Sequence, residues 1–216
     1  MQLIKPFVGV ALALCIRSHF THAAPAVDQS LIVPAGHATG FSDPVHLPAQ
    51  TFTVGVSGKL SRVDLAIGGV SQVADVNVRI LGTIGGVPVM HQELAMVTLP
   101  GEALPNLGGW FTTPRLPVDL SAFNIKVNEG DVLAISAQST AFDANPFAFL
   151  WWDTSGMYQR GRAYSGHTEY SQYFPVMGAE LDRGFATYVV VPEPDAVALL
   201  LAALIGSIRP LKSWEG

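Results

Sequence analysis

The sequence predicts an all-β protein, with an antiparallel β-sandwich over residues 25–190 and one short apolar helix at each end of the chain. Three observations favour this fold class. Apolar residues between the ends alternate with a period of two, which is typical of half-buried strands and not of amphipathic helices. Turn-forming pairs such as Gly68-Gly69, Gly85-Gly86 and Asn145-Pro146 separate these segments. The continuous apolar runs are confined to the two ends.

The composition of the chain excludes several classes of protein. The chain has 216 residues, of which 49% are hydrophobic and 13% are charged, and its formal net charge is −5. Such a chain is neither a disordered protein nor one with the basic surface that nucleic acid requires. The one cysteine, Cys15, excludes a disulfide framework and a multi-cysteine zinc site.

The N-terminal segment has the pattern of an export signal. Lys5 precedes an apolar run from Pro6 to Ile16, and Thr21-His22-Ala23-Ala24 supplies small residues at which signal peptidase would cut. The run is shorter than the roughly 20 apolar residues that cross a bilayer. We therefore predict a signal peptide over residues 1–24. The alternatives are a buried N-terminal helix and a lipoprotein signal at Leu12-Ala13-Leu14-Cys15.

The body, residues 25–190, contains about eight or nine strand candidates, and this number favours an antiparallel sandwich of jelly-roll-like topology. Val63, Leu65 and Ile67 alternate with polar or small residues, as do Val76, Val78 and Ile80. The turn 128–131 separates Ile125 and Val127 from Leu133 and Ile135. The strand candidates are 51–56, 59–67, 74–81, 87–99, 110–113, 125–127, 133–135, 147–152 and 185–190, and 104–117 is expected to be a long loop or an irregular edge.

The order of these segments resembles the sandwich bodies of exported bacterial proteins related to carbohydrate-binding jelly rolls. The matching parts are the strand 59–67, the strand 74–81 that follows it, and the later segment 120–135 with its turn. The resemblance implies a sandwich body that contacts a polysaccharide.

The C-terminal segment begins where two prolines must end the last strand. Val191-Pro192-Glu193-Pro194 leads to the apolar run Ala196–Ile208, which Arg209 and Lys212 follow. As a helix this run would be about 20 Å long, against a hydrocarbon core of about 30 Å. The two basic residues would hold its C-terminal side in the cytoplasm, and the body would then lie across the inner membrane.

This tail resembles the PEP-CTERM sorting signal of exopolysaccharide-producing Gram-negative bacteria. The resemblance implies that Pro192, Glu193 and Pro194 are read by a membrane enzyme called exosortase, which cleaves near the motif. It also implies that residues 196–208 are a transient membrane anchor and that Arg209 and Lys212 are its stop-transfer charges. The usual run of arginines is reduced here to two basic residues, which Pro210-Leu211 separates.

An aromatic cluster is the main candidate for ligand contact. Its members are Trp151, Trp152, Tyr158 and Tyr164, with polar and glycine residues between them. Aromatic rings stack on sugar faces, so the cluster could contact a glycan. The alternative is that these rings pack in the core and at its rim. Adjacent residues of a strand point to opposite faces, so either Trp151 or Trp152 must be exposed or covered by another element.

The other reactive residue types form no recognised motif. His37, His46, His91 and His167 are scattered, without the spacing of metal ligands, so we expect structural or surface roles. We expect no cofactor, with calcium between Asp143 and Asp153 as the alternative. No nucleophile motif is present.

The sequence therefore leads to two hypotheses of different classes. The first is an exported, non-enzymatic sandwich protein that is anchored transiently and then located at the cell surface or outside the cell, in contact with exopolysaccharide. The alternative is a secreted enzyme that acts on polysaccharide, with Asp153 or Glu169 as its acid or base. A minor alternative is an inner-membrane protein that keeps its tail.

Overall fold

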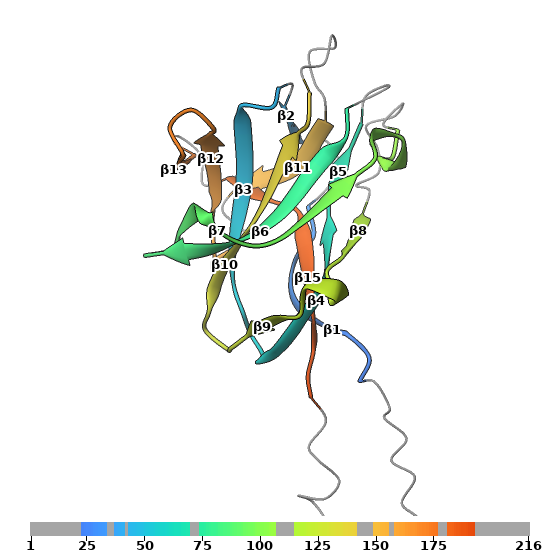
Figure 1. Ribbon diagram of the computed structural model, residues 1–216, viewed down its shortest axis with the longest axis vertical. Coiled ribbons are helices and arrows are strands. Elements are labelled where there is room, and N and C mark those ends of the chain that lie inside the picture. The colour runs from blue at the N-terminus through green and yellow to red at the C-terminus, as the bar shows by residue number, and fades with distance from the viewer. Residues whose placement is uncertain are drawn as a thin grey trace, which may run out of the picture.

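The fold was analysed in a computed structural model, which describes residues 23–33, 37–41, 43–69, 74–106, 115–141, 149–155, 158–176 and 181–192. These residues form antiparallel sheets, as the period-two pattern predicts (Figure 1). The two helical elements among them are single 3₁₀ turns at Gly101–Ala103 and Ser121–Phe123. The predicted end segments 1–24 and 196–208, and the strand candidate 110–113, lie almost wholly or wholly outside the described residues.

The described residues form three sheets. The first has the order β1 (Ala26–Leu31), β15 (Phe185–Val190), β4 (Gly58–Leu65) and β8 (Leu116–Asp119), and β9 (Ile125–Val127) also pairs with β4. The second has the order β13 (Gln172–Pro175), β12 (Ala163–His167), β3 (His46–Thr53), β10 (Val132–Ser139), β6 (Val76–Ile84) and β7 (Val87–Leu99). The third has the order β14 (Leu181–Arg183), β11 (Phe149–Ser155) and β2 (Ala38–Phe41), with β5 (Ile67–Gly68) also paired to β11.

One continuous apolar core joins the sheets. The alternating side chains of β4 and β6 that the sequence placed inside are fully buried, as are Phe52 of β3 and Val189 of β15. Phe52 packs against Phe185 of the first sheet, with ring centroids 5.9 Å apart. The prediction of a sandwich-like all-β fold is therefore confirmed.

The third sheet begins where two strands of the first sheet separate. β4 and β15 are paired as far as Leu65 and Phe185. Beyond this pair the two strands separate, and β11 lies between their continuations, paired with β5 on one side and with β14 on the other. Three backbone hydrogen bonds close this junction: Ala66 N–H to Gly184 O, Trp152 N–H to Ala66 O, and Gly184 N–H to Trp152 O.

The first and last described strands leave the sandwich at one end. Ala26 at the start of β1 pairs with Val189 near the end of β15, and Figure 1 shows both strands running to the lower end of the molecule. Val190 pairs with Lys59 at the start of β4. β3 begins at the opposite end with His46, since Val54 just after β3 bonds to the turn beside β9. We call the end of the sandwich at Val190 the terminal end, and the opposite end, at His46, the distal end.

Several elements differ from the sequence expectation. β8 lies at the boundary of the segment expected to be a loop or irregular edge, and β3 begins earlier than the candidate 51–56. β1, β2, β12, β13 and β14 were not expected. β12 and β13 contain glycine, serine and tyrosine without a continuous apolar face, so alternation does not identify them.

Candidate functional site

The aromatic candidates lie mainly in the interior. The exposed fractions of Trp151, Trp152 and Tyr164 are 0%, 1% and 4%. Trp151 and Trp152 still point to opposite faces of β11, but both faces are covered. A ring with no exposed face cannot stack on a sugar, so at these three residues the structure favours the alternative of packing over glycan contact. Trp151 and Trp152 pack in the core, and Tyr164 packs in a second apolar cluster on the outer face of the second sheet. Tyr158 is half-buried and packs against the core.

A buried polar cluster lies beside these rings. The guanidinium of Arg183, which is 3% exposed, donates from Nη1 to Ala49 O at 2.9 Å and to Tyr164 O at 3.1 Å. It thereby connects the third sheet to β3 and β12 of the second. Burial lowers the pKa of Arg183 to about 10, although Asp153 and Asp182 nearby act to raise it.

Both carboxylates of this cluster also have hydrogen-bond partners other than Arg183. Asp153, which is 1% exposed, is hydrogen-bonded to His37 Nδ1 and accepts from Thr39 Oγ1. Asp182 accepts from Gln50 Nε2 at 3.3 Å and from Tyr158 N–H at 2.9 Å. The guanidinium therefore lies near two buried carboxylates, and removing its charge would leave those carboxylates less well compensated.

The same geometry bears on the enzyme and calcium alternatives. Both oxygens of Asp153 are engaged beneath His37 and Thr39, whereas Glu169 is an exposed turn residue beside His167. The structure therefore does not offer Asp153 to a polymer on the surface. Asp143, the other candidate calcium ligand, lies outside the described residues. Within the described ranges, no group of three or more His, Cys, Asp or Glu residues is placed to hold a metal ion.

Tyr158 links the cluster to β1. Its hydroxyl donates to Gln29 Oε1 at 3.2 Å, and its ring packs edge-to-face on Phe185 with centroids 5.1 Å apart. Burial raises the pKa of Tyr158 from 10.0 to about 12. The folded protein therefore retains this phenolic proton over a pH range in which the unfolded chain has lost it.

This difference predicts an alkaline loss of stability. The contribution of Tyr158 is complete below pH 10 and declines as the pH rises towards 12, because the unfolded chain binds fewer protons there. We expect the urea midpoint of Tyr158→Phe to fall less between pH 9 and pH 11.5 than that of the unsubstituted chain. Tyr170→Phe, at a residue that is 64% exposed, is the matched control and should follow the unsubstituted chain. Equal slopes for all three proteins would contradict the assignment.

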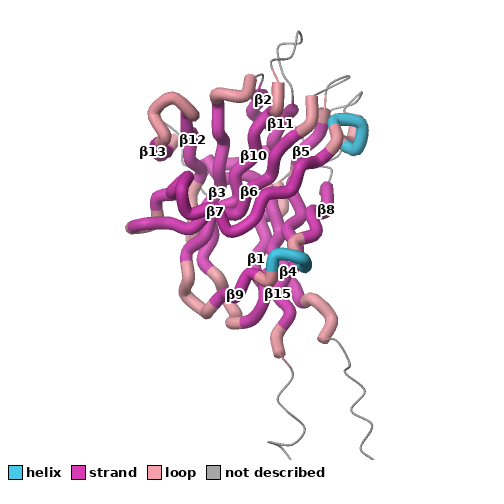
Figure 2. The backbone as a smooth tube through the Cα atoms, in the orientation of Figure 1, coloured by secondary structure: helices cyan, strands magenta, loops and turns pink. Residues whose placement is uncertain are grey.

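The second sheet carries a further apolar cluster on the face that points away from the core. Its buried members are Leu47, Ala49, Leu81, Ala134, Tyr164 and Tyr173, and Met90 packs against them. β7 and β13, the two edges of this sheet, contact each other, and the β6–β7 pairing shifts register after Ile80 and after Leu81, where β7 contains the extra residues. Figure 2 shows this hairpin and the β12–β13 hairpin on the same side of the molecule.

A pocket of about 310 Å³ lies on this outer face, and we call it the outer pocket. Its apolar lining consists of Leu47, Leu81, Met90 and Tyr173, and its polar lining consists of Arg79, Glu93, Gln138 and Thr168. Arg79 Nε and Glu93 Oε2 are 3.0 Å apart, and Arg79 Nη1 donates to Gln138 Oε1. The pocket thus combines an apolar floor with polar side chains that are already fixed.

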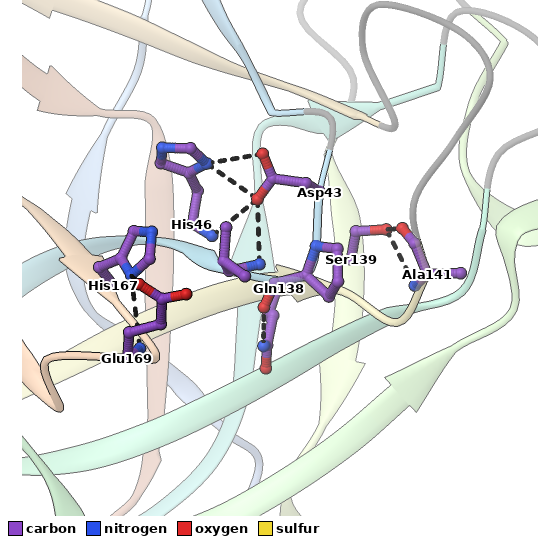
Figure 3. Close-up of polar contacts among 9 residues, drawn as sticks. Asp43, His46, Gln138, Ser139, Ala141, His167 and Glu169 are labelled. Carbon is purple, nitrogen blue, oxygen red and sulfur yellow. Dashed lines mark hydrogen bonds and ion pairs between the residues drawn. The ribbon is translucent and has the colours of Figure 1, made fainter.

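Next to the outer pocket, at the distal end, two of the predicted surface histidines meet (Figure 3). The rings of His46 and His167 lie edge-to-face with centroids 5.6 Å apart, because His46 of β3 pairs with His167 of β12. Asp43 accepts from the N–H groups of Val45 and His46, and both its oxygens lie 2.8 Å from His46 Nδ1. Burial raises the pKa of the Asp43 carboxyl, but these hydrogen bonds outweigh it and the pKa is lowered overall.

The first residues of the predicted sorting segment follow the last strand at the terminal end. Val191 and Pro192 are exposed after the last strand, and the exposed fraction of Val191 is 43%. Glu193, Pro194, Arg209 and Lys212 lie outside the described residues. The part of the chain that the structure describes includes no helix that is both long and apolar enough to cross a bilayer.

Comparison with known proteins adds little to this description. No family model matches the chain, and no curated protein is similar to it. A solved structure described as the VP2 subviral particle of infectious bursal disease virus aligns with 86% of this chain at 10% identity and a TM-score of 0.17. The alignment covers 46% of that viral chain. A TM-score this low supports no conclusion about fold or function.

Proposed function

We propose that this chain is an exported, non-enzymatic β-sandwich protein of the cell envelope or extracellular matrix, delivered through a PEP-CTERM signal over residues 191–216. The signal peptide directs export, the apolar segment 196–208 holds the protein transiently in the inner membrane, and an exosortase-type enzyme cleaves near the motif. The protein then contacts exopolysaccharide at the cell surface or outside the cell.

One observation carries the proposal. The described fold ends at Val190, the core residue Val189 precedes it, and Val191 and Pro192 are exposed at the terminal end of the sandwich. A sorting enzyme needs an accessible recognition segment outside the folded body. Val191 and Pro192, with which the motif begins, are exposed after the last strand. β1 leaves from the same end, so both export signals would adjoin one side of the body.

The finer topology that we propose is jelly-roll-like, with a signal helix and a short apolar helix at the two ends. The strand order supports the first part of this proposal. The chain passes from β3 in the second sheet to β4 in the first, back to β6 and β7, and again to β8 and β9 before β10. Such alternation between facing sheets is typical of double-sheet Greek-key folds.

The test is Glu193→Gln in a host that has an exosortase. This change removes the charge of the central motif residue and keeps its shape. We expect the variant to stay in the membrane fraction, whereas the unsubstituted protein is released from that fraction. Glu129→Gln, the same chemical change at an exposed turn residue, should be released normally. Release of Glu193→Gln at the normal rate would contradict recognition of the motif, and retention of the unsubstituted protein would favour an inner-membrane protein that keeps its tail.

A further inference from the structure

The outer pocket has the size and chemistry of a small-ligand site. Its volume of about 310 Å³ is at the low end of the roughly 300–1,000 Å³ range of ligand pockets. Leu47 and Leu81 of its floor are 3% and 1% exposed, so the floor belongs to the packed structure and is formed before any ligand arrives. A pocket of this size accommodates a compact ligand unit and not a folded partner.

The polar side chains of the pocket are held in position by each other. Arg79 is fixed between Glu93 and Gln138, and Gln138 Nε2 in turn donates to Pro44 O. A ligand therefore meets donors and acceptors whose side-chain entropy is already reduced, which lowers the cost of binding. The charges of Arg79 and Glu93 offset each other, so the lining has no formal net charge and favours an uncharged ligand.

The polar surface continues beyond the pocket across neighbouring strands. Asn77 of β6 lies opposite both Gln138 of β10 and Thr98 of β7, and Thr98 Oγ1 donates to Asn77 Oδ1 at 2.7 Å. Amides and hydroxyls both donate and accept hydrogen bonds. A row of such groups next to the pocket matches a ligand with many hydroxyls, and it runs across the sheet as an extended polymer would.

We propose that the outer pocket binds one neutral sugar ring of a polysaccharide, with its apolar face on the half-buried Met90, above the packed floor of Leu47 and Leu81, and its hydroxyls towards Arg79, Glu93 and Gln138. This proposal rests on the proposed function and replaces the aromatic cluster as the place of glycan contact. Leu47 and Thr168 lie near the distal end, beside His46 and His167, so a body held by its tail presents the pocket away from the membrane.

The first test blocks the pocket. Thr168 is exposed in the turn after β12 and lines the pocket, so Thr168→Trp should fill its mouth without disturbing the core. Titration calorimetry of the full chain with neutral hexose oligosaccharides should show binding that is at least tenfold weaker for this variant. Ser30→Trp, at an exposed position of β1 in the other sheet, is the matched control and should bind normally. Equal binding by both variants would overturn the pocket assignment, as would the absence of binding to every neutral oligosaccharide.

The second test changes the charge of the pocket. Glu93→Gln leaves Arg79 without its acidic partner, so the ratio of affinities for uronate-containing over neutral oligosaccharides should rise at least fivefold. Glu102→Gln, at an exposed 3₁₀-turn residue, should leave this ratio unchanged. An unchanged ratio in Glu93→Gln would overturn the inference. If the unsubstituted protein is released normally but binds no sugar, this site is refuted and the proposed sorting is unaffected.

Discussion

Arg183→Met is expected to lower the free energy of unfolding by about 3–5 kcal/mol, because it removes the buried guanidinium from a cluster with two buried carboxylates. Asp153 and Asp182 would remain in the interior without that charge, and the carbonyls of Ala49 and Tyr164 would lose the hydrogen bonds from Arg183 Nη1. Urea unfolding followed by tryptophan fluorescence measures the loss, since Trp151 lies 5.6 Å from the guanidinium.

Arg62→Met is the matched control for this change. Arg62 also has an aspartate partner, Asp64, at 2.9 Å, and its guanidinium lies 3.6 Å from the centroid of the Tyr188 ring. Its side chain is 40% exposed, so water screens the pair and we expect a loss of about 1 kcal/mol or less. If Arg183→Met cost no more than Arg62→Met, the buried network would not have the structural role described here.

Gly161→Ala is expected to cost about 3 kcal/mol, since β3 approaches the backbone of Gly161 too closely for any side chain. A Cβ at this position would lie 1.9 Å from Thr51 O and 2.6 Å from Thr51 C, both of them backbone atoms. Arg162, which follows Gly161, is hydrogen-bonded to Thr51, and Arg160, which precedes it, accepts from Thr53 Oγ1, so the two segments cannot separate without losing these bonds. The midpoint of thermal unfolding should fall markedly.

Gly85→Ala separates this steric effect from the general cost of replacing glycine. Gly85 lies in the open turn between β6 and β7, where φ is +59° and nothing lies within 4 Å of an added Cβ. A left-handed alanine costs about 1 kcal/mol. Equal losses at the two positions would show that the backbone at Gly161 can move away, which contradicts the packing described.

Local alternation was sufficient to predict the strands whose two faces have different environments. In β6, Val76, Val78 and Ile80 are fully buried, while Asn77 and Arg79 point to the other face. The turn before β10 could also be predicted, because it is formed by its own consecutive residues. Gly130 adopts φ of +91°, a conformation that favours glycine, and Asp131 N–H bonds to Asn128 O. These features depend on a few consecutive residues, and so a single sequence contains them.

The environment of Trp151 and Trp152 could not be predicted in the same way. Both are buried because β11 enters between the separating ends of β4 and β15, and Trp151 Nε1 donates to Gly184 O at 3.0 Å. That arrangement joins residues far apart in the sequence. The aromatic residues of β11 therefore indicated core packing correctly, but they did not indicate an exposed contact with a ligand.

The outer pocket was missed for a related reason. Arg79 was identifiable as an outward-facing residue of its strand, but Glu93 and Gln138 become its neighbours only through the register of β7 and β10. The register shifts between β6 and β7 leave no distinct mark in the sequence. Polar residues at outward positions of adjacent strands were the only available signal, and alternation alone does not determine which strands are adjacent.

The central claim is that the C-terminal segment is a removable sorting signal and not part of the folded body. Intact-mass analysis of the protein recovered from a host with an exosortase tests this claim most directly. The account predicts a mature chain that begins at Ala24 or Pro25 and lacks residues 196–216. A mature chain that retains residues 196–216 would contradict it.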